Sequence, residues 1–266
     1  MGVAVRAADE FSLAELAAAF TASYEGYFVP LEIDEAALRH MVEIFDLDPT
    51  QSLVAVDGGE LVGLANLGRR GDRTWVGGVG VVAGRRGEGL GERLMRELLD
   101  RARQASARET ALEVILENTP AIRLYEKLGF DTTRELDILS LPGDTAGGTA
   151  EDVPLDRARS TIASLRDEPE PWQRADESVE NLVRHNRSPS ALASDGGAAI
   201  YRADGGRITV LQMAGDEPAL RELVATLRGK GAVSAGNFPS GGAVSAALRT
   251  AGAEVVVRQR EMRLAL

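Results

Sequence analysis

The chain has 266 residues, of which 44% are hydrophobic and 27% are charged. These proportions are typical of a soluble globular protein, and the length suits one large domain or two small ones. The formal net charge of −11 argues against general binding of nucleic acid, which requires a basic surface. Cysteine is absent, which excludes disulfides, thiolate nucleophiles and cysteine metal sites, and the 2 histidines give no reason to expect a metal.

The sequence predicts no membrane partner. It contains no apolar run of about 18 residues, the length that a membrane-spanning helix needs. The first residues, Met1-Gly2-Val3-Ala4-Val5-Arg6, lack the pattern of a signal peptide. We therefore expect a cytoplasmic protein.

The predicted elements begin with two helices and a series of strands. Ser12 and Glu15 predict an N-terminal capping box for the first helix, and Asp34 predicts the start of the second. A turn at residues 57–59 predicts a hairpin between its flanking strands. The expected strands of this part cover residues 3–9, 53–56, 61–67 and 75–82.

A glycine-rich loop, Arg86-Gly87-Glu88-Gly89-Leu90-Gly91, follows the last of these strands and opens a helix that extends to about residue 104. Small residues let backbone N–H groups approach a ligand closely, and a helix N-terminus carries partial positive charge. The side chains of Arg85 and Arg86 could add charge-assisted contacts. The loop therefore predicts a phosphate or pyrophosphate site, the alternative being a tight turn without a ligand.

The first half closes with a strand, a short helix and another strand, at residues 112–116, 120–128 and 135–141. The glycine- and threonine-rich stretch that follows has the composition of a linker. We expect a first domain of residues 1–142, a linker of residues 143–150 and a second domain of residues 151–266.

The second half repeats the order of the first, with a final strand at residues 253–264 that mirrors the strand at 135–141. The two copies differ at the glycine-rich loop, where the second copy has Ala214-Gly215-Asp216-Glu217-Pro218. Carboxylates at a helix N-terminus would repel a pyrophosphate, so we expect the second copy to bind none.

Three motifs of the first half occur in a defined order. They are Val79-Gly80-Val81-Val82-Ala83 followed by the glycine-rich loop, Leu112-Glu113-Val114 followed by Asn118, and Ala121-Ile122-Arg123-Leu124-Tyr125-Glu126-Lys127-Leu128-Gly129-Phe130. Over residues 3–141 this set resembles the GNAT acyltransferase superfamily. Ala83-Gly84 departs from the Pro-Glu that this family often has before the arginine.

The resemblance implies an α/β (α+β) fold. Two tandem GNAT-like units would each have a mixed, mostly antiparallel twisted sheet flanked by helices, the second being a degenerate copy. Acetyl-CoA would be the co-substrate, lying where two central strands splay apart. Its pyrophosphate would bind the amides of Arg86, Gly87, Glu88, Gly89, Leu90 and Gly91, and its pantetheine arm would pair along Val79, Val81 and Val82.

The resemblance also implies roles in catalysis. The Val81 N–H would polarise the thioester carbonyl, Asn118 would contact the pantetheine region, and Tyr125 would protonate the departing thiolate. Asn118 could equally cap the short helix, and Tyr125 could be an ordinary core residue.

The acceptor side of the site stays open. Glu113, a chain of water molecules and the region of Tyr24 and Glu25 are all candidates for the general base. Tyr24, Tyr27 and Phe28 lie in the loop that borders the acceptor site in this family, and core packing is the alternative.

The leading interpretation is an N-acyltransferase. An acetyl group would pass directly to a primary amine of a small molecule or peptide, because no cysteine can carry an acyl intermediate. The alternative is an acyl-CoA-binding or sensing protein without turnover. A P-loop nucleotide site is disfavoured because no Lys-Ser/Thr follows the loop. The second copy would shape the acceptor groove or mediate a homodimer.

Overall fold

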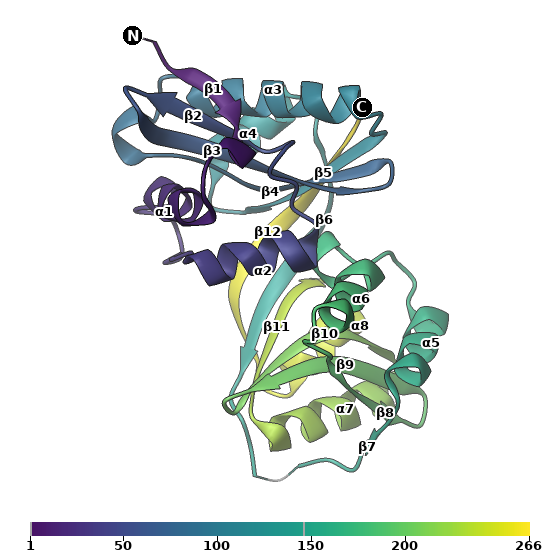
Figure 1. Ribbon diagram of the computed structural model, residues 1–266. Coiled ribbons are helices and arrows are strands. Elements are labelled where there is room, and N and C mark those ends of the chain that lie inside the picture. Colours follow the sequence, from purple (N-terminus) through teal and green to yellow (C-terminus); the bar gives the residue numbers. More distant parts are fainter. Residues whose placement is uncertain (1, 146) are drawn as a thin grey trace. The chain divides into compact units, whose positions relative to one another are not determined.

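The computed structural model describes residues 2–145 and 147–266. The chain divides into two compact units of similar size. Unit 1 comprises Met1–Thr133 together with Glu261–Leu266, and unit 2 comprises Arg134–Arg260. Each unit contains a mixed, mostly antiparallel sheet flanked by helices, as the sequence predicts (Figure 1).

Unit 1 follows the predicted order of elements. Its strands are β1 (Ala4–Ala7), β2 (Leu53–Asp57), β3 (Glu60–Arg70), β4 (Arg73–Val81) and β5 (Glu109–Ile115). Its helices are α1 (Leu13–Ser23), α2 (Glu35–Phe45), α3 (Leu90–Gln104) and α4 (Thr119–Lys127). The capping box of Ser12 and Glu15 is present at the start of α1, and Asp34 caps α2, both as predicted.

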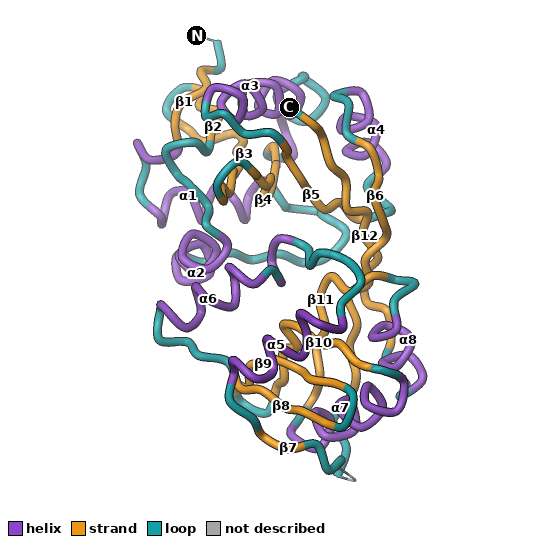
Figure 2. Tube along the Cα trace, turned by 90° about the vertical axis from the view of Figure 1, so that its right-hand side faces the viewer, coloured by secondary structure: helices purple, strands orange, loops and turns teal. Residues whose placement is uncertain are grey.

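Helices cover both faces of the sheet of unit 1 (Figure 2). The apolar stripe of α3, which includes Leu94, Met95 and Leu98, packs with α4 on one face. Leu16 and Phe20 of α1 pack with α2 on the other. The sheet is therefore buried on both sides, and its loops are left to carry the site.

The central strands of unit 1 separate along their length. β4 pairs antiparallel with β3 over its whole length, but it pairs parallel with β5 only from Arg73 to Trp75. Beyond this point no ladder joins β4 to β5 in the described chain. The carboxyl-terminal half of β4 thus borders a splay that leads to the glycine-rich loop.

Unit 2 repeats this arrangement. Its strands are β7 (Glu151–Asp152), β8 (Ser190–Ser194), β9 (Gly197–Asp204), β10 (Arg207–Gly215) and β11 (Ala232–Pro239). Its helices are α5 (Leu155–Leu165), α6 (Asp176–Arg184), α7 (Glu217–Lys230) and α8 (Ala243–Thr250). β10 and β11 pair parallel from Arg207 to Val210 and then splay, as β4 and β5 do in unit 1.

The last strand of each sequence half extends into the other unit. β6 (Asp131–Leu141) ends the first half, yet Leu136–Leu141 pair antiparallel with β11 of unit 2. β12 (Glu254–Ala265) ends the second half, yet Met262 is buried in the core of unit 1. The Leu266 amide also donates to the Arg108 carbonyl beside β5.

This exchange explains why the units do not coincide with the expected divisions 1–142, 143–150 and 151–266. Composition marks the glycine-rich segment as a linker, whereas strand pairing places the boundaries near Thr133 and Arg260. Asp144 and Thr149 of that segment donate backbone hydrogen bonds to α7 of unit 2. Ala146 of the expected linker and Met1 of the expected first domain lie outside the described residues.

Candidate active site

The glycine-rich loop of unit 1 presents backbone amides at the start of α3. Gly87 and Gly89 have φ angles of 83° and 81°, a region that favours glycine, and Gly89 is the N-cap of α3 without a capping side chain. Among the described residues, no carbonyl accepts a hydrogen bond from the amides of Gly87 to Gly91. Unpaired N–H groups at the positive end of a helix form a cradle for an anion.

The two arginines before this cradle are already engaged inside the protein. Arg85 pairs with Asp57 at 2.5 Å and with Glu88 at 2.9 Å. Arg86 donates to the backbone carbonyls of Val81, Ser23 and Glu25. The cradle therefore consists mainly of backbone amides, and the side-chain contacts to a ligand that the sequence suggested are not formed in advance.

The backbone of β4 offers two donors to the splay. The Val82 amide donates to Val62 of β3 at 3.1 Å. Because hydrogen-bonded and non-bonded pairs alternate along an antiparallel ladder, the Val81 and Val79 backbones face away from β3, toward the splay. Their carbonyls accept from Arg86 and from the Tyr24 hydroxyl, respectively. Their N–H groups are left directed into the splay, whereas Val82 points its N–H the other way.

Three polar side chains meet near this backbone. The Asn118 side chain caps α4 by accepting from the Ala121 amide at 3.3 Å, and its Nδ2 donates to the Tyr27 hydroxyl at 3.4 Å. Tyr125 of α4 is 8% exposed and packs on Phe130. Burial raises the pKa of the Tyr125 phenol above its ordinary value, with a further contribution from Tyr27. The Tyr125 hydroxyl therefore keeps its proton at neutral pH and can donate it.

The loop after α1 forms a continuous row of aromatic rings. The ring centroids of Phe20, Tyr24, Tyr27 and Phe28 follow one another at 5.0, 4.9 and 5.2 Å, and Phe28 at the end of the row is exposed. Burial raises the pKa of Tyr24, so this phenol is also neutral. The row thus runs from the packed core at Phe20 to the exposed ring of Phe28.

Glu113, a candidate for the general base, is engaged elsewhere. Its Oε2 accepts a hydrogen bond from the Trp75 indole N–H at 2.8 Å. This hydrogen bond ties one oxygen of the carboxylate to the Trp75 ring.

Residues 13–130 match the family model described as the acetyltransferase (GNAT) family. Unit 1 belongs to the GNAT family. A mycothiol acetyltransferase from Corynebacterium glutamicum (strain R) is 48% identical over 52 residues, and this match covers 20% of the present chain and 18% of that protein. The matched segment is thus a small part of that relative.

Solved structures extend the GNAT fold to the whole chain. A GCN5-related N-acetyltransferase from Sphaerobacter thermophilus has a TM-score of 0.76 at 18% identity and covers 99% of this chain and 95% of its own. A tandem GNAT protein from the clavulanic acid biosynthesis pathway has a TM-score of 0.64 at 14% identity, with coverages of 99% and 98%. The chain has the architecture of two GNAT units in tandem.

Unit 2 differs from unit 1 at its splay. The Arg174 guanidinium donates to the carbonyl of Leu211 on β10 at 2.9 Å and to that of Asn237 on β11 at 2.8 Å. It pairs with Glu170 at 2.6 Å and lies 3.2 Å from the Phe238 ring centroid. Burial lowers the pKa of Arg174 to about 10, so it stays charged at neutral pH. One side chain thus bridges the two splayed strands.

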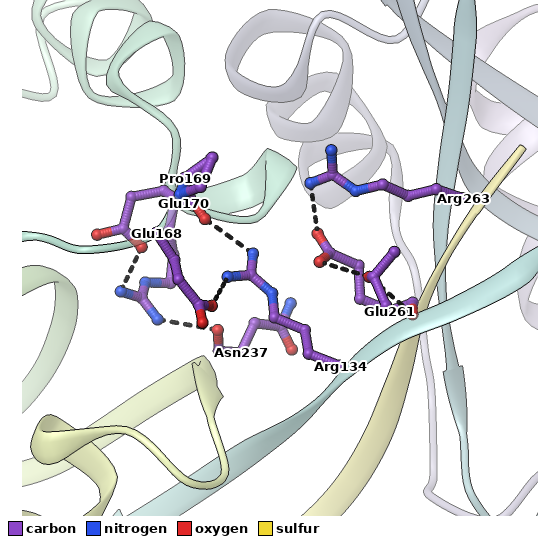
Figure 3. Close-up of polar contacts among 9 residues, drawn as sticks. Arg134, Glu168, Pro169, Glu170, Asn237, Glu261 and Arg263 are labelled. Atoms are coloured by element: carbon purple, nitrogen blue, oxygen red, sulfur yellow. Dashed lines mark hydrogen bonds and ion pairs between the residues drawn. The ribbon is translucent and has the colours of Figure 1, made fainter. Parts of the chain in front are cut away.

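The polar network of Glu170 extends to Arg134 at the start of unit 2, and Figure 3 labels both residues beside Glu168 and Pro169. Arg134 donates to Glu168 and to the Pro169 carbonyl, both at 2.8 Å. A cavity of about 690 Å³ lies beside this network, between the end of β10 and the start of α8. The splay of unit 2 therefore keeps only its outer part open.

The helix that follows β10 begins with a side-chain cap. Asp216 caps α7 by accepting from the Ala219 amide at 2.9 Å, where α3 of unit 1 has an uncapped start. The sequence drew attention to Asp216 but missed Arg174. A buried arginine leaves no periodic signal, and its pairing with Glu170 four residues earlier is common on exposed helices.

The described residues contain no group of three or more histidine or acidic side chains arranged to hold a metal. None of the described helices combines the length and apolar character needed to span a membrane.

Proposed function

We propose that unit 1 is an N-acyltransferase that moves an acetyl group from acetyl-CoA to a primary amine in a ternary complex. The observation that carries the proposal is the run of unpaired amides from Gly87 to Gly91 beside a splay into which Val79 and Val81 direct their N–H groups. The pyrophosphate would occupy the amides and the pantetheine arm would follow β4.

The chemistry follows from the donors around the splay. The Val81 N–H would hydrogen-bond the thioester oxygen, on which negative charge develops as the amine attacks the carbonyl carbon. The carbon–sulfur bond then breaks, and the Tyr125 hydroxyl would protonate the leaving thiolate. The phenol is protonated at neutral pH, as this role requires.

The proton of the ammonium acceptor would leave through water. Glu113 is occupied by Trp75, and the aromatic row beside the splay carries neutral phenols. We propose the row as the wall of the acceptor site, which suits the apolar stem of an amine of a small molecule or peptide.

The test is calorimetric titration of acetyl-CoA into the purified chain. One site per chain is expected, because Arg174 bridges the splay of unit 2 and Asp216 caps its helix. Two sites would contradict the expectation that unit 2 binds no acetyl-CoA. No binding would refute the proposed function. Release of free thiol with a panel of amines then separates turnover from binding alone. A protein that binds acetyl-CoA tightly but releases no thiol with any amine would favour the sensing alternative.

A further inference from the structure

The side chain of Arg86, the residue directly before the amide cradle, turns to the carbonyls of β4 and α1, and its own amide donates to the Ala83 carbonyl at 3.4 Å rather than joining the cradle. Its Nε donates to the carbonyl of Val81, the last residue of β4, at 3.0 Å. Its Nη2 donates to the carbonyl of Ser23 at 3.2 Å and to that of Glu25 at 2.8 Å. One guanidinium thus joins the end of β4 to the end of α1.

The end of α1 needs such a partner. The last carbonyls of a helix accept no hydrogen bond from an amide of the same helix, and they form the negative end of the helix dipole. The last turn of α1 has no basic residue of its own. Arg86, 63 positions after Ser23, supplies the missing cation. The planar fork of arginine can reach two elements at once, which a lysine ammonium does less well.

The end of α1 also lies unusually close to β4. A Cβ atom at Gly80 would be 2.6 Å from the Ser23 Cβ, so only glycine allows this approach. The row of rings defined by Tyr24, Tyr27 and Phe28, here called the acceptor wall, continues from this point. Its two other tethers, Tyr24 to Val79 and Tyr27 to Asn118, are both long at 3.4 Å. Of these contacts from other elements to the segment, the one from Arg86 to Glu25 is the shortest at 2.8 Å.

We propose that Arg86 is a positioning residue, whose side chain holds the acceptor wall against the end of β4 rather than binding the pyrophosphate. The role of the wall in acceptor binding rests on the function proposed above; the contact itself does not. Because Arg86 grips the Val81 carbonyl, the wall is fixed beside the Val81 N–H that would polarise the thioester. Arg86, directly before the amide cradle, then links the glycine-rich loop to the acceptor wall through its side chain.

The neighbouring arginine provides a matched control. Arg85 has the same charge and borders the same loop, but its partners are the carboxylates of Asp57 and Glu88. A change at Arg85 alters the charge pairing near the cradle without touching α1. Arg86→Lys and Arg85→Lys both keep the positive charge and remove only the planar fork.

Hydrogen exchange of the chain without ligand tests the contact directly. In Arg86→Lys, the amides of Tyr24, Glu25 and Tyr27, which are held in turns, should exchange about tenfold faster than in the parent chain. Amides in the middle of α3 should not change, and Arg85→Lys should leave the three amides as they are. Unchanged exchange of these amides in Arg86→Lys would overturn the proposal.

Acetyl-CoA binding and kinetics with an acceptor amine test whether Arg86 positions the acceptor wall without binding the pyrophosphate. Arg86→Lys and Arg86→Gln should bind acetyl-CoA within about twofold of the parent, because backbone amides form the cradle. With an acceptor amine found in the thiol-release panel, KM for the amine should rise about tenfold while KM for acetyl-CoA stays. A tenfold loss of acetyl-CoA affinity in Arg86→Gln that is absent in Arg86→Lys would identify a phosphate ligand and overturn the positioning role. If the parent chain binds no acetyl-CoA, the proposed function fails, whereas the exchange result still decides the contact.

Discussion

The Thr133 hydroxyl donates a hydrogen bond to the backbone carbonyl of Glu261, 3.1 Å away, although the two residues are 128 positions apart. This contact lies within unit 1, where the last residues of β12 join the sheet, and a second one runs from Thr133 to the Glu261 carboxylate. Arg263 continues the strand with an ion pair to Glu109 of β5 at 3.1 Å. Unit 1 is thus completed by residues 261–266.

The packing of β12 in the core of unit 1 leads to a prediction about stability. Met262 is fully buried in the core of unit 1, so Met262→Ala should destabilise that unit by about 2–5 kcal/mol through lost contacts and a cavity. Met262→Leu, which nearly preserves volume, should cost less than about 1.5 kcal/mol. Denaturant unfolding of the full chain measures both, and equal stability of all three proteins would show that β12 contributes little to unit 1.

The amide cradle makes a prediction for cofactor binding. Gly89→Glu would place a side chain and a negative charge at a position with φ of 81°, so acetyl-CoA affinity should fall by at least about a hundredfold. Gly71→Glu is the matched control, because Gly71 has φ of 62° in a turn between β3 and β4 and also has open space around its Cβ position. Calorimetry on both variants checks the effect, and micromolar binding by Gly89→Glu would remove the site from this loop.

Tyr125 makes a prediction for turnover. Tyr125→Phe keeps the ring that packs on Phe130 but removes the acidic proton, so kcat should fall about a hundredfold with unchanged acetyl-CoA affinity. Because burial raises the pKa of Tyr125, the parent enzyme should lose no activity through ionisation of this phenol up to about pH 10. Tyr201→Phe, a change at a buried tyrosine of unit 2, controls for the loss of a hydroxyl alone. A Tyr125→Phe enzyme with parental kcat would exclude the acid role.

The buried ion pair of Arg174 and Glu170 in unit 2 leads to a prediction about how stability depends on pH. Arg174→Met leaves Glu170 buried without its cation, which should cost about 3–5 kcal/mol at neutral pH. Burial already raises the pKa of Glu170, and Arg174 opposes this shift, so removing Arg174 raises that pKa further. In the variant the folded state holds its proton more tightly than the unfolded state does. The loss of unfolding free energy in Arg174→Met relative to the parent chain should therefore become smaller as the pH falls toward about 5.

The double variant Glu170→Gln, Arg174→Met removes both charges. It should recover part of the stability lost in Arg174→Met and should lose the pH dependence of the deficit. Urea unfolding at several pH values provides the measurement. A deficit in Arg174→Met that does not vary with pH would show that Glu170 is not the group responsible.

The sequence alone determined the local elements and the place of the glycine-rich loop. Capping residues, apolar stripes and turn glycines are short-range signals, and they located α1, the β2–β3 hairpin, the glycine-rich loop at the start of α3, and α4 with Asn118 and Tyr125. The repeat of these signals also predicted two units of one fold. All of these features arise from interactions within a few residues of each other, which is why one sequence is enough to read them.

Only the tertiary structure decided which strand completes which unit and what the arginines do. β6 and β12 have similar patterns, so nothing local assigns Met262 to the core of unit 1 or Leu139 to that of unit 2. An arginine beside a glycine-rich loop suggests contact with a phosphate ligand. The Arg86 side chain instead donates hydrogen bonds to the carbonyls of Ser23 and Glu25, at and just after the end of α1. Arg174 likewise finds its partners on two strands far from it in sequence. The long, flexible side chain of an arginine binds carbonyls that lack other partners in the folded chain. Long-range packing, and not the neighbouring residues in the sequence, decides which carbonyls these are.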